Sequence, residues 1–134
     1  MICVLVDSDV LVWLTRGHPG AAMRLKQFGT WRISAITYME LAQGCRDKPE
    51  LERVKKALGA SSTTIAPVTE SICERAMLLI DHHALGDGLR LADALIAATA
   101  LEHGLPLLTA NIKHFGPIRG LNVEWFDRTQ DATS

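Results

Sequence analysis

The chain has 134 residues, of which 48% are hydrophobic and 22% are charged, as is typical of a single folded globular domain. Its formal net charge is -1, which excludes recognition of nucleic acid by overall positive charge, so any such partner must be held locally. Three cysteines without a C-x-x-C pair exclude a disulfide framework and a zinc site of the usual spacing.

The chain begins with MICVLVDSDV, in which residues 2–6 form a continuous apolar run rich in β-branched side chains. Such a run predicts a strand that is covered on both faces. It is too short to cross a membrane, and it has neither the basic start nor the small-residue cleavage site of an export signal. We therefore expect no export and no membrane helix, and the cysteine pattern predicts a reducing, cytoplasmic location.

Short apolar runs and amphipathic segments alternate along the rest of the chain. Further strands are predicted at residues 31–34, 63–66, 106–109 and 122–126. Helices are predicted at residues 9–16, 19–28, 37–44, 49–58, 69–84 and 90–103, with Pro49 opening one and Gly59 and Gly104 each ending one. This order predicts an α/β fold, a three-layer α/β/α sandwich with a mostly parallel central sheet, over residues 1–127, followed by a short flexible tail at 128–134.

Acidic and polar side chains follow the predicted strands or begin the predicted helices. Asp7 follows the first strand, Glu40 lies in the first turns of the helix after the second, and Asp93 opens the helix before the fourth. Thr109 and Asn111 come at the end of that fourth strand. Because strand ends and helix starts of a parallel sheet converge on one edge, we expect these side chains to gather there.

A cluster of carboxylates has a chemical consequence. Two carboxylates about 4 Å apart repel by roughly 4 kcal/mol at an effective dielectric constant near 20, so three require protons or a cation among them. A hard divalent ion, Mg²⁺ or Mn²⁺, would remove the repulsion and leave open positions for water and a phosphate. The pattern therefore indicates metal-assisted hydrolysis of a phosphodiester.

Each acid also has a simpler interpretation when it is taken alone. Asp7 and Asp93 are both placed where a carboxylate commonly caps a helix N-terminus. Glu40, between Met39 and Leu41, is typical of a solvated helix position. The prediction of a site depends on the joint placement of the three acids at one edge.

The segments VLVDSDVLVWL, SAITYMELAQG and GLRLADALIAATALEHGLPLLTANIKHF resemble the PIN-domain family, and within it the VapC-type toxins of toxin–antitoxin pairs. The resemblance extends from residue 2 to about residue 126. It implies a Mg²⁺-dependent endoribonuclease, with Mn²⁺ as a substitute, that hydrolyses RNA. It further implies neutralisation by a VapB-type antitoxin and assembly as a homodimer or as a larger toxin–antitoxin complex.

The resemblance also implies roles for individual residues. Asp7, Glu40, Asp93 and Asn111 are the expected catalytic residues, and Asp7 and Asp93 are the expected metal ligands. Glu40 would bind a second ion or orient water. The expected supporting or substrate-binding residues are Ser8, Asp9, Thr109 and Arg90.

Two positions depart from the pattern of the family. Asp9 stands where many relatives carry Asn, which adds negative charge to the site or caps the helix. Relatives often carry a further acid at the position of Asn111 or of His114, and neither residue here is acidic. This difference weakens the expectation of a second metal ion.

Two other functions remain open from the sequence. The segment VDSDV also fits the D-x-D-x-[TV] signature of haloacid-dehalogenase-like phosphatases, in which the first aspartate is the nucleophile. That family requires a later lysine and acidic pair, for which the chain offers Lys113 and the tail residues Asp127 and Asp131. The other alternative is a degenerate PIN fold that binds RNA or a protein partner without cutting.

Two further groups of residues bear on binding. A group of basic residues near the N-terminus, and Arg90 beside Asp93, are candidates for phosphate contact. The members of the N-terminal group are Arg16, His18, Arg24 and Lys26. Trp13 belongs either to the core or to a surface that contacts a partner.

Overall fold

The computed structural model describes residues 3–129 as an alternation of strands and helices. The strands are β1 (Cys3–Val6), β2 (Thr30–Ser34), β3 (Thr64–Ala66), β4 (Leu107–Thr109) and β5 (Val123–Trp125). The helices are α1 (Ser8–Thr15), α2 (Pro19–Lys26), α3 (Ala35–Gln43), α4 (Lys48–Ala60), α5 (Glu70–Asp87), α6 (Leu91–His103) and α7 (Ile112–Phe115). The predicted flexible tail at 128–134 lies outside the described residues from residue 130 onward.

The five strands form one sheet in the order β3-β2-β1-β4-β5. Every pairing in it is parallel, which confirms the predicted parallel sheet. In the centre, Leu5 of β1 is aligned with Arg32 of β2 on one side and with Leu107 of β4 on the other. The carboxyl ends of β1 and β4 therefore lie next to each other.

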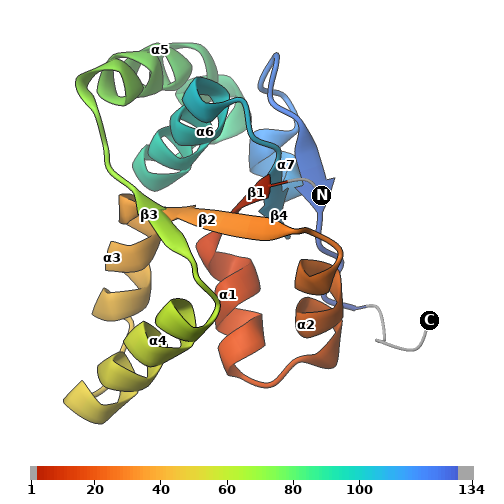
Figure 1. Cartoon of the computed structure of the whole chain (residues 1–134). Helices are drawn as coiled ribbons and strands as arrows, with labels where there is room; N and C mark the ends of the chain where they lie inside the picture. The colour runs from red at the N-terminus through yellow and green to blue at the C-terminus, as the bar shows by residue number, and fades with distance from the viewer. Residues whose placement is uncertain (1–2, 130–134) are drawn as a thin grey trace.

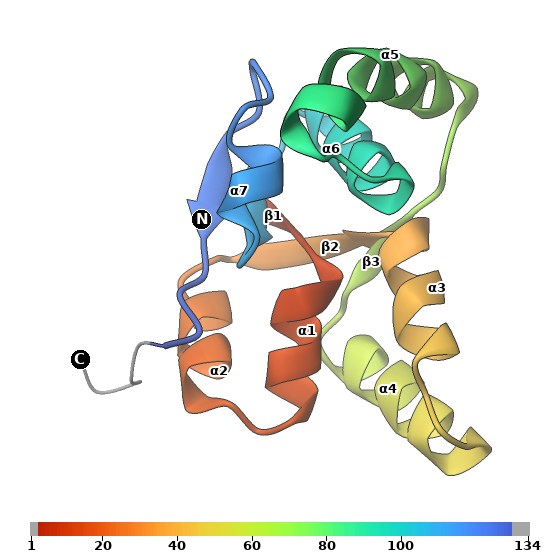
Figure 2. The same cartoon turned by 180° about the vertical axis from the view of Figure 1, so that it is seen from behind.

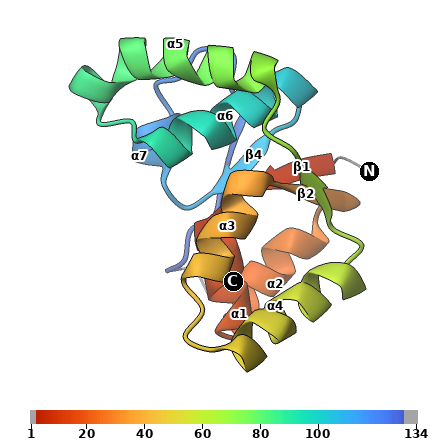
Figure 3. The ribbon, with the colours of Figure 1, turned by 90° about the vertical axis from the view of Figure 1, so that its left-hand side faces the viewer.

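Helices cover both faces of the sheet, which confirms the three-layer arrangement. Figures 1 and 2 show α5, α6 and α7 on one side of the strands and α1, α2, α3 and α4 on the other. The side view in Figure 3 shows the same two helical layers. Among residues 3–129, no helix is both long and apolar enough to cross a membrane.

The side chains of β1 contribute alternately to two separate hydrophobic cores, because successive strand residues point to opposite faces of the sheet. Leu5 packs with the helices of the α5–α6 layer, including Ala97 and Phe115. Val4 and Val6 pack on the opposite face with residues of α1 and α2. All three strand side chains have no exposed surface, so the chain leaves β1 at a fixed position in the middle of the sheet.

Helix α6 is buried along most of its length by small side chains. Ala94, Ala97, Ala98 and Ala100 are fully buried, and alanine combines high helix propensity with close packing. Gly104 ends the helix with a left-handed backbone at φ 62°. The first turn of α6, which carries Asp93, is thereby held at the edge of the sheet.

The ends of two helices and the presence of one short helix differ notably from the predictions. Helix α4 continues through Gly59, which has helical geometry, and Ser62 takes the positive φ instead. Helix α5 continues to Asp87, whose carboxylate contacts His83 one turn earlier at 2.7 Å, and Gly88 forms the left-handed cap. The short helix α7 was not predicted, because its four residues are too few to show a helical period.

Candidate active site

Asp7 stands at the carboxyl end of the central strand and caps the helix that follows. Its Oδ1 accepts a hydrogen bond of 2.8 Å from the backbone N–H of Ser8. Its Oδ2 accepts one of 2.8 Å from the hydroxyl of Thr109. Asp7 is only 6% exposed, so it is both the helix cap considered from the sequence and a buried acid at the sheet edge.

Thr109 links the two central strand ends. Its hydroxyl donates to Asp7 and accepts a hydrogen bond of 3.0 Å from the backbone N–H of Asn111. Asp9 Oδ2 lies farther from the same hydroxyl, at 3.4 Å. Because a hydroxyl has one hydrogen to donate, Asp7 is its principal acceptor. The adjacency of β1 and β4 thus fixes the orientation of the Asp7 carboxylate.

Asp9 brings a second carboxylate to the same place from the first turn of α1. Its Oδ2 accepts a hydrogen bond of 3.1 Å from the backbone N–H of Ala110. Its Oδ1 is buried and has no hydrogen-bond partner among the described residues. A buried carboxylate oxygen without a donor is costly unless a proton or cation meets it.

The pKa values of Asp7 and Asp9 are both raised. Burial, followed by the negative charges of Asp9 and Asp93, raises the pKa of Asp7 to about 7. Burial is also the main cause that raises the pKa of Asp9, and Asp93 adds to it. Asp93 therefore lies close enough to act electrostatically on both.

Asp93 is held by the start of its own helix and by His114 of α7. Its Oδ2 accepts a hydrogen bond of 3.3 Å from the backbone N–H of Arg90. Arg90 is the N-cap of α6 and Asp93 is its third residue, so Asp93 supports the helix start from within the first turn and is not the N-cap that its simpler interpretation supposed. The same oxygen lies 3.1 Å from Nδ1 of His114. With a proton on Nδ1, the ring donates to Asp93. The amide nitrogen of Asn111 lies 2.9 Å from the same Nδ1, and because an amide N–H only donates, this contact is a hydrogen bond only in the tautomer without a proton on Nδ1.

Glu40 and Arg90 lie at the outer side of the site. Glu40 is exposed on α3, and its Oε1 accepts a hydrogen bond of 3.1 Å from the Ser8 hydroxyl. Ser8 thus connects Glu40 to the start of α1, immediately after Asp7. The Arg90 side chain is exposed, and its contact with Asp93 is made by its backbone.

The acids form a loose cluster rather than a ready set of metal ligands. Within residues 3–129, no three His, Cys, Asp or Glu side chains are grouped so that they could hold one ion. The donor chemistry nevertheless suits a hard cation, because carboxylate oxygens are the ligands that such ions prefer. The unpartnered oxygen of Asp9 and the raised pKa of Asp7 both indicate a place that lacks positive charge.

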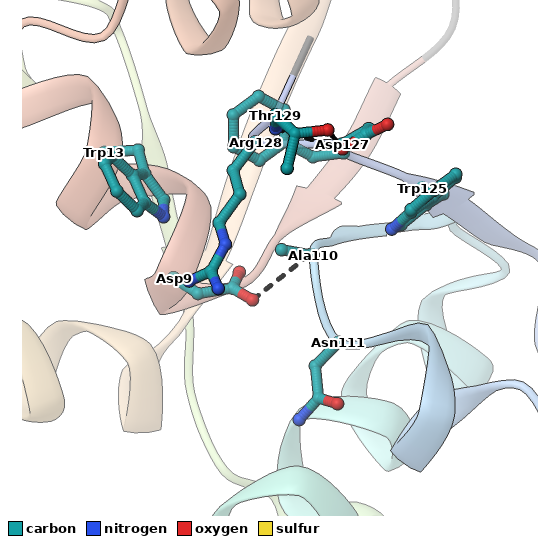
Figure 4. A pocket seen from close by; sticks show the side chains of 9 residues that line it. Asp9, Trp13, Ala110, Asn111, Trp125, Asp127, Arg128 and Thr129 are labelled. Carbon is teal, nitrogen blue, oxygen red and sulfur yellow. Dashed lines mark hydrogen bonds between the residues drawn. The ribbon is translucent and has the colours of Figure 1, made fainter.

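A pocket of about 470 Å³ adjoins this cluster. Its lining residues are Asp9, Trp13, Ala110, Asn111, Trp125, Phe126, Asp127, Arg128 and Thr129. Figure 4 shows the indoles of Trp13 and Trp125 on opposite sides of the opening. Sequence reasoning missed Trp125, although a tryptophan at the predicted end of an edge strand was a usable signal.

The N-terminal basic group has mainly structural contacts. Arg24 forms an ion pair of 3.0 Å with Glu124. His18 caps α2, because its Nδ1 accepts a hydrogen bond of 3.2 Å from the backbone N–H of Ala21. The guanidinium of Arg16 lies 5.8 Å from the centre of the Trp13 ring. We expected this group to contact phosphate. Any such contact would compete with the ion pair, the helix cap and the ring contact that already stabilise the fold.

Comparisons of this chain with known proteins all identify the same family. The PIN domain model matches residues 4–116. Ribonuclease VapC1 from Rickettsia felis is 32% identical over 126 residues, which cover 90% of this chain and 93% of that protein. Ribonuclease VapC10 from Mycobacterium tuberculosis is 36% identical over 120 residues, covering 84% of this chain and 85% of that protein.

Solved structures show the same fold. A toxin–antitoxin complex from Klebsiella pneumoniae contains a chain that is 34% identical, with a TM-score of 0.76, and the match covers 88% of this chain and 94% of that one. VapBC2 from Rickettsia felis, bound to a DNA fragment from its promoter, matches with a TM-score of 0.80 at 22% identity. This second match covers 94% of this chain and 100% of that one, and it concerns the fold alone.

Proposed function

The chain belongs to the PIN-domain family and to its VapC group, and on this premise we propose that it is a metal-dependent endoribonuclease toxin. The observation that carries the proposal is the buried carboxylate of Asp7 beside the half-buried carboxylate of Asp9, at the carboxyl edge of the sheet, with Asp93 acting on both. A fold has no structural need for such mutually repelling acids. Asp9 also lines a pocket, and acids with raised pKa values beside a pocket are typical of a catalytic site.

Mg²⁺ is the proposed cofactor, and Mn²⁺ is a proposed substitute. Asp7 and Asp93 are the proposed ligands, and the unpartnered Oδ1 of Asp9 offers a further oxygen donor. When bound, such an ion polarises a phosphodiester and lowers the pKa of a water molecule that attacks it. The absence of a preformed group of three ligands among residues 3–129 implies that the carboxylates adjust on binding.

The remaining side chains position these acids. Thr109 fixes the rotation of the Asp7 carboxylate through its 2.8 Å hydrogen bond. His114 holds Asp93 from the side of α7, and Asn111 lies beside the same ring nitrogen. Glu40, tied to the site by the Ser8 hydroxyl, is proposed to orient water, and Arg90 is proposed to contact the RNA backbone from the rim.

RNA is the proposed substrate, and a VapB-type antitoxin is the proposed partner. The names of two curated relatives as ribonucleases support the substrate. The toxin–antitoxin complex that contains a 34% identical chain supports the partner. Homodimerisation, or a larger toxin–antitoxin assembly, belongs to the same proposal.

A module that binds without cutting is the second candidate. The loose grouping of the acids within the described part of the chain favours it, as does His114 at a position where relatives often carry an acid. The phosphatase considered from VDSDV is not proposed, because the family match is to PIN domains. Incubation of the purified chain with RNA, with Mg²⁺ or with EDTA, separates the two candidates: metal-dependent cleavage supports the nuclease, and intact RNA supports the binding module.

A further inference from the structure

The pocket beside the acids shares residues with the candidate active site. Asp9 and Asn111 contribute to both, so a group bound in the pocket lies directly next to the proposed position of the scissile phosphate. The volume of about 470 Å³ falls within the range of about 300 to 1,000 Å³ that is usual for small-molecule sites. One nucleotide unit fits such a space.

The strand register places the indole of Trp125 beside this position. Trp125 of β5 is aligned with Thr109 of β4, and aligned residues of neighbouring strands project from the same face of a sheet. The Thr109 hydroxyl reaches Asp7, so Trp125 projects on the side of the site. Trp125 is 49% exposed, which leaves a flat ring available for contact.

The opposite wall of the pocket is already rigid. Nε2 of His18 donates a hydrogen bond of 2.9 Å to the backbone oxygen of Arg128, since Nδ1 of the same ring acts as the acceptor that caps α2. The His18 ring meets Trp13 edge to face, with ring centres 5.3 Å apart, and it meets Phe126 in the same way at 5.6 Å. A fixed wall lowers the ordering cost of binding.

The carboxylates in the pocket select against an anionic group. Asp9 and Asp127 line it, and hydrogen bonds from Thr129 lower the pKa of Asp127, which keeps it ionised. These charges repel a phosphate from the interior of the pocket. The guanidinium of Arg128 lies over the Trp13 ring, 5.8 Å from its centre, and so belongs to the wall formed by Trp13. A flat group without negative charge suits the lining best.

We propose that this pocket receives one unpaired nucleobase of the RNA, stacked on Trp125, while the adjoining phosphodiester lies at Asp7, Asp9 and Asp93. Bases of single-stranded RNA commonly bind by stacking on aromatic side chains. The inference rests on the proposed function, because it identifies the substrate as RNA with an unpaired base at the cleavage point. It assigns Trp125 to substrate binding and not to the chemical step.

Binding with Ca²⁺ in place of Mg²⁺ tests the pocket with the acids neutralised, because carboxylate oxygens are also ligands of Ca²⁺, and gel analysis of the probe establishes that it stays intact. The probes are a mixed-sequence single-stranded oligoribonucleotide and a fully paired duplex of the same sequence, titrated against wild type, Trp125→Ala and Trp125→Phe. We expect wild type to prefer the single strand, and Trp125→Ala to weaken its binding about tenfold or more, as loss of a base–aromatic stack does. Trp125→Phe keeps a ring and should restore most of the affinity.

Met77→Ala is the matched control, because Met77 is a large exposed apolar residue on α5, outside the pocket. It should leave RNA affinity unchanged. With Mg²⁺ present, Trp125→Ala should raise KM for single-stranded RNA while kcat changes much less. Circular dichroism and the melting temperature of each variant establish that it is folded.

Three outcomes would overturn the nucleobase pocket: no RNA binding by wild type, equal affinity of wild type and Trp125→Ala, or equal loss in Trp125→Phe and Trp125→Ala. Unchanged RNA affinity together with weaker antitoxin binding would make the pocket a protein-docking surface instead. Failure of the nuclease proposal is separate: RNA that stays intact with Mg²⁺ and Mn²⁺, but binds in a Trp125-dependent manner, would contradict cleavage and leave the pocket standing.

Discussion

The hydroxyl of Thr109 donates a 2.8 Å hydrogen bond to the carboxylate of Asp7, across 102 residues of sequence. The bond exists because β4 pairs with β1, so both strands deliver their last side chains to one edge. It stabilises the ionised form of Asp7 and lowers a pKa that burial raises. The orientation of the Asp7 carboxylate therefore depends on sheet pairing and not on a local motif.

Thr109→Val should keep the shape of the side chain and remove this hydrogen bond. Bonds to charged groups are worth about 1.5 to 3 kcal/mol, so we expect cleavage to fall by about tenfold or more, with a further rise in the pKa of Asp7. Thr109→Ser retains the hydroxyl and serves as the control. Single-turnover cleavage rates over a range of pH measure both effects, and equal rates for Val and Ser would show that the hydrogen bond is unimportant.

Asp7→Asn should stabilise the metal-free protein, most strongly above neutral pH. Burial raises the pKa of Asp7 from its ordinary value of 3.8 to about 7 in the folded protein, so the folded state binds its proton more tightly than the unfolded state. Stability is therefore highest below about pH 4 as far as this group is concerned, and it falls as pH rises towards 7. The loss above pH 7 is on the order of 4 kcal/mol, at about 1.36 kcal/mol per pKa unit.

Melting curves in EDTA at about pH 5 and about pH 8 measure this effect. Asparagine is as good a helix cap as aspartate, so the capping bond to Ser8 is kept. The stabilisation by Asp7→Asn should be larger at the higher pH. A variant that is less stable than wild type at both values would show that Asp7 carries no unfavourable charge.

Mg²⁺ or Mn²⁺ should raise the melting temperature of wild type above neutral pH, because the cation replaces the proton among the acids. At a free ion concentration of about 100 times Kd, the gain in stability is about 2.7 kcal/mol. Asp7→Asn should lose most of this gain. A matched monovalent salt controls for ionic strength, and stabilisation of wild type and variant to the same extent would place the ion elsewhere.

The parallel sheet and the positions of Asp7, Glu40 and Asp93 could be predicted, because each depends on a short stretch of sequence. The apolar run before Asp7 is long enough to indicate a doubly covered strand, and the alanine-rich helix after Asp93 has clear ends. Parallel topology then brings strand ends together without further information. Asp7 also caps its helix, which confirms its simpler interpretation, whereas the catalytic roles of Asp7 and Asp93 stay predictions.

The support of Asp93 and the pocket could not be predicted in the same way. His114 reaches Asp93 from a helix of four residues, which is too short to produce a periodic pattern. Trp125 lines the pocket because of its register with Thr109, and strand register between distant segments is a property of the tertiary structure. The unpartnered oxygen of Asp9 likewise follows from packing that no local pattern specifies.

Cleavage of RNA by wild type and by Asp93→Asn is the most direct measurement of the central claim, that these acids form a metal-dependent nuclease site. We predict that wild type cuts RNA with Mg²⁺ or Mn²⁺ and not in EDTA, and that Asp93→Asn, which can still accept the hydrogen bond from the backbone N–H of Arg90, folds normally and does not cut. Cleavage that persists in EDTA, or an Asp93→Asn protein as active as wild type, would contradict the claim.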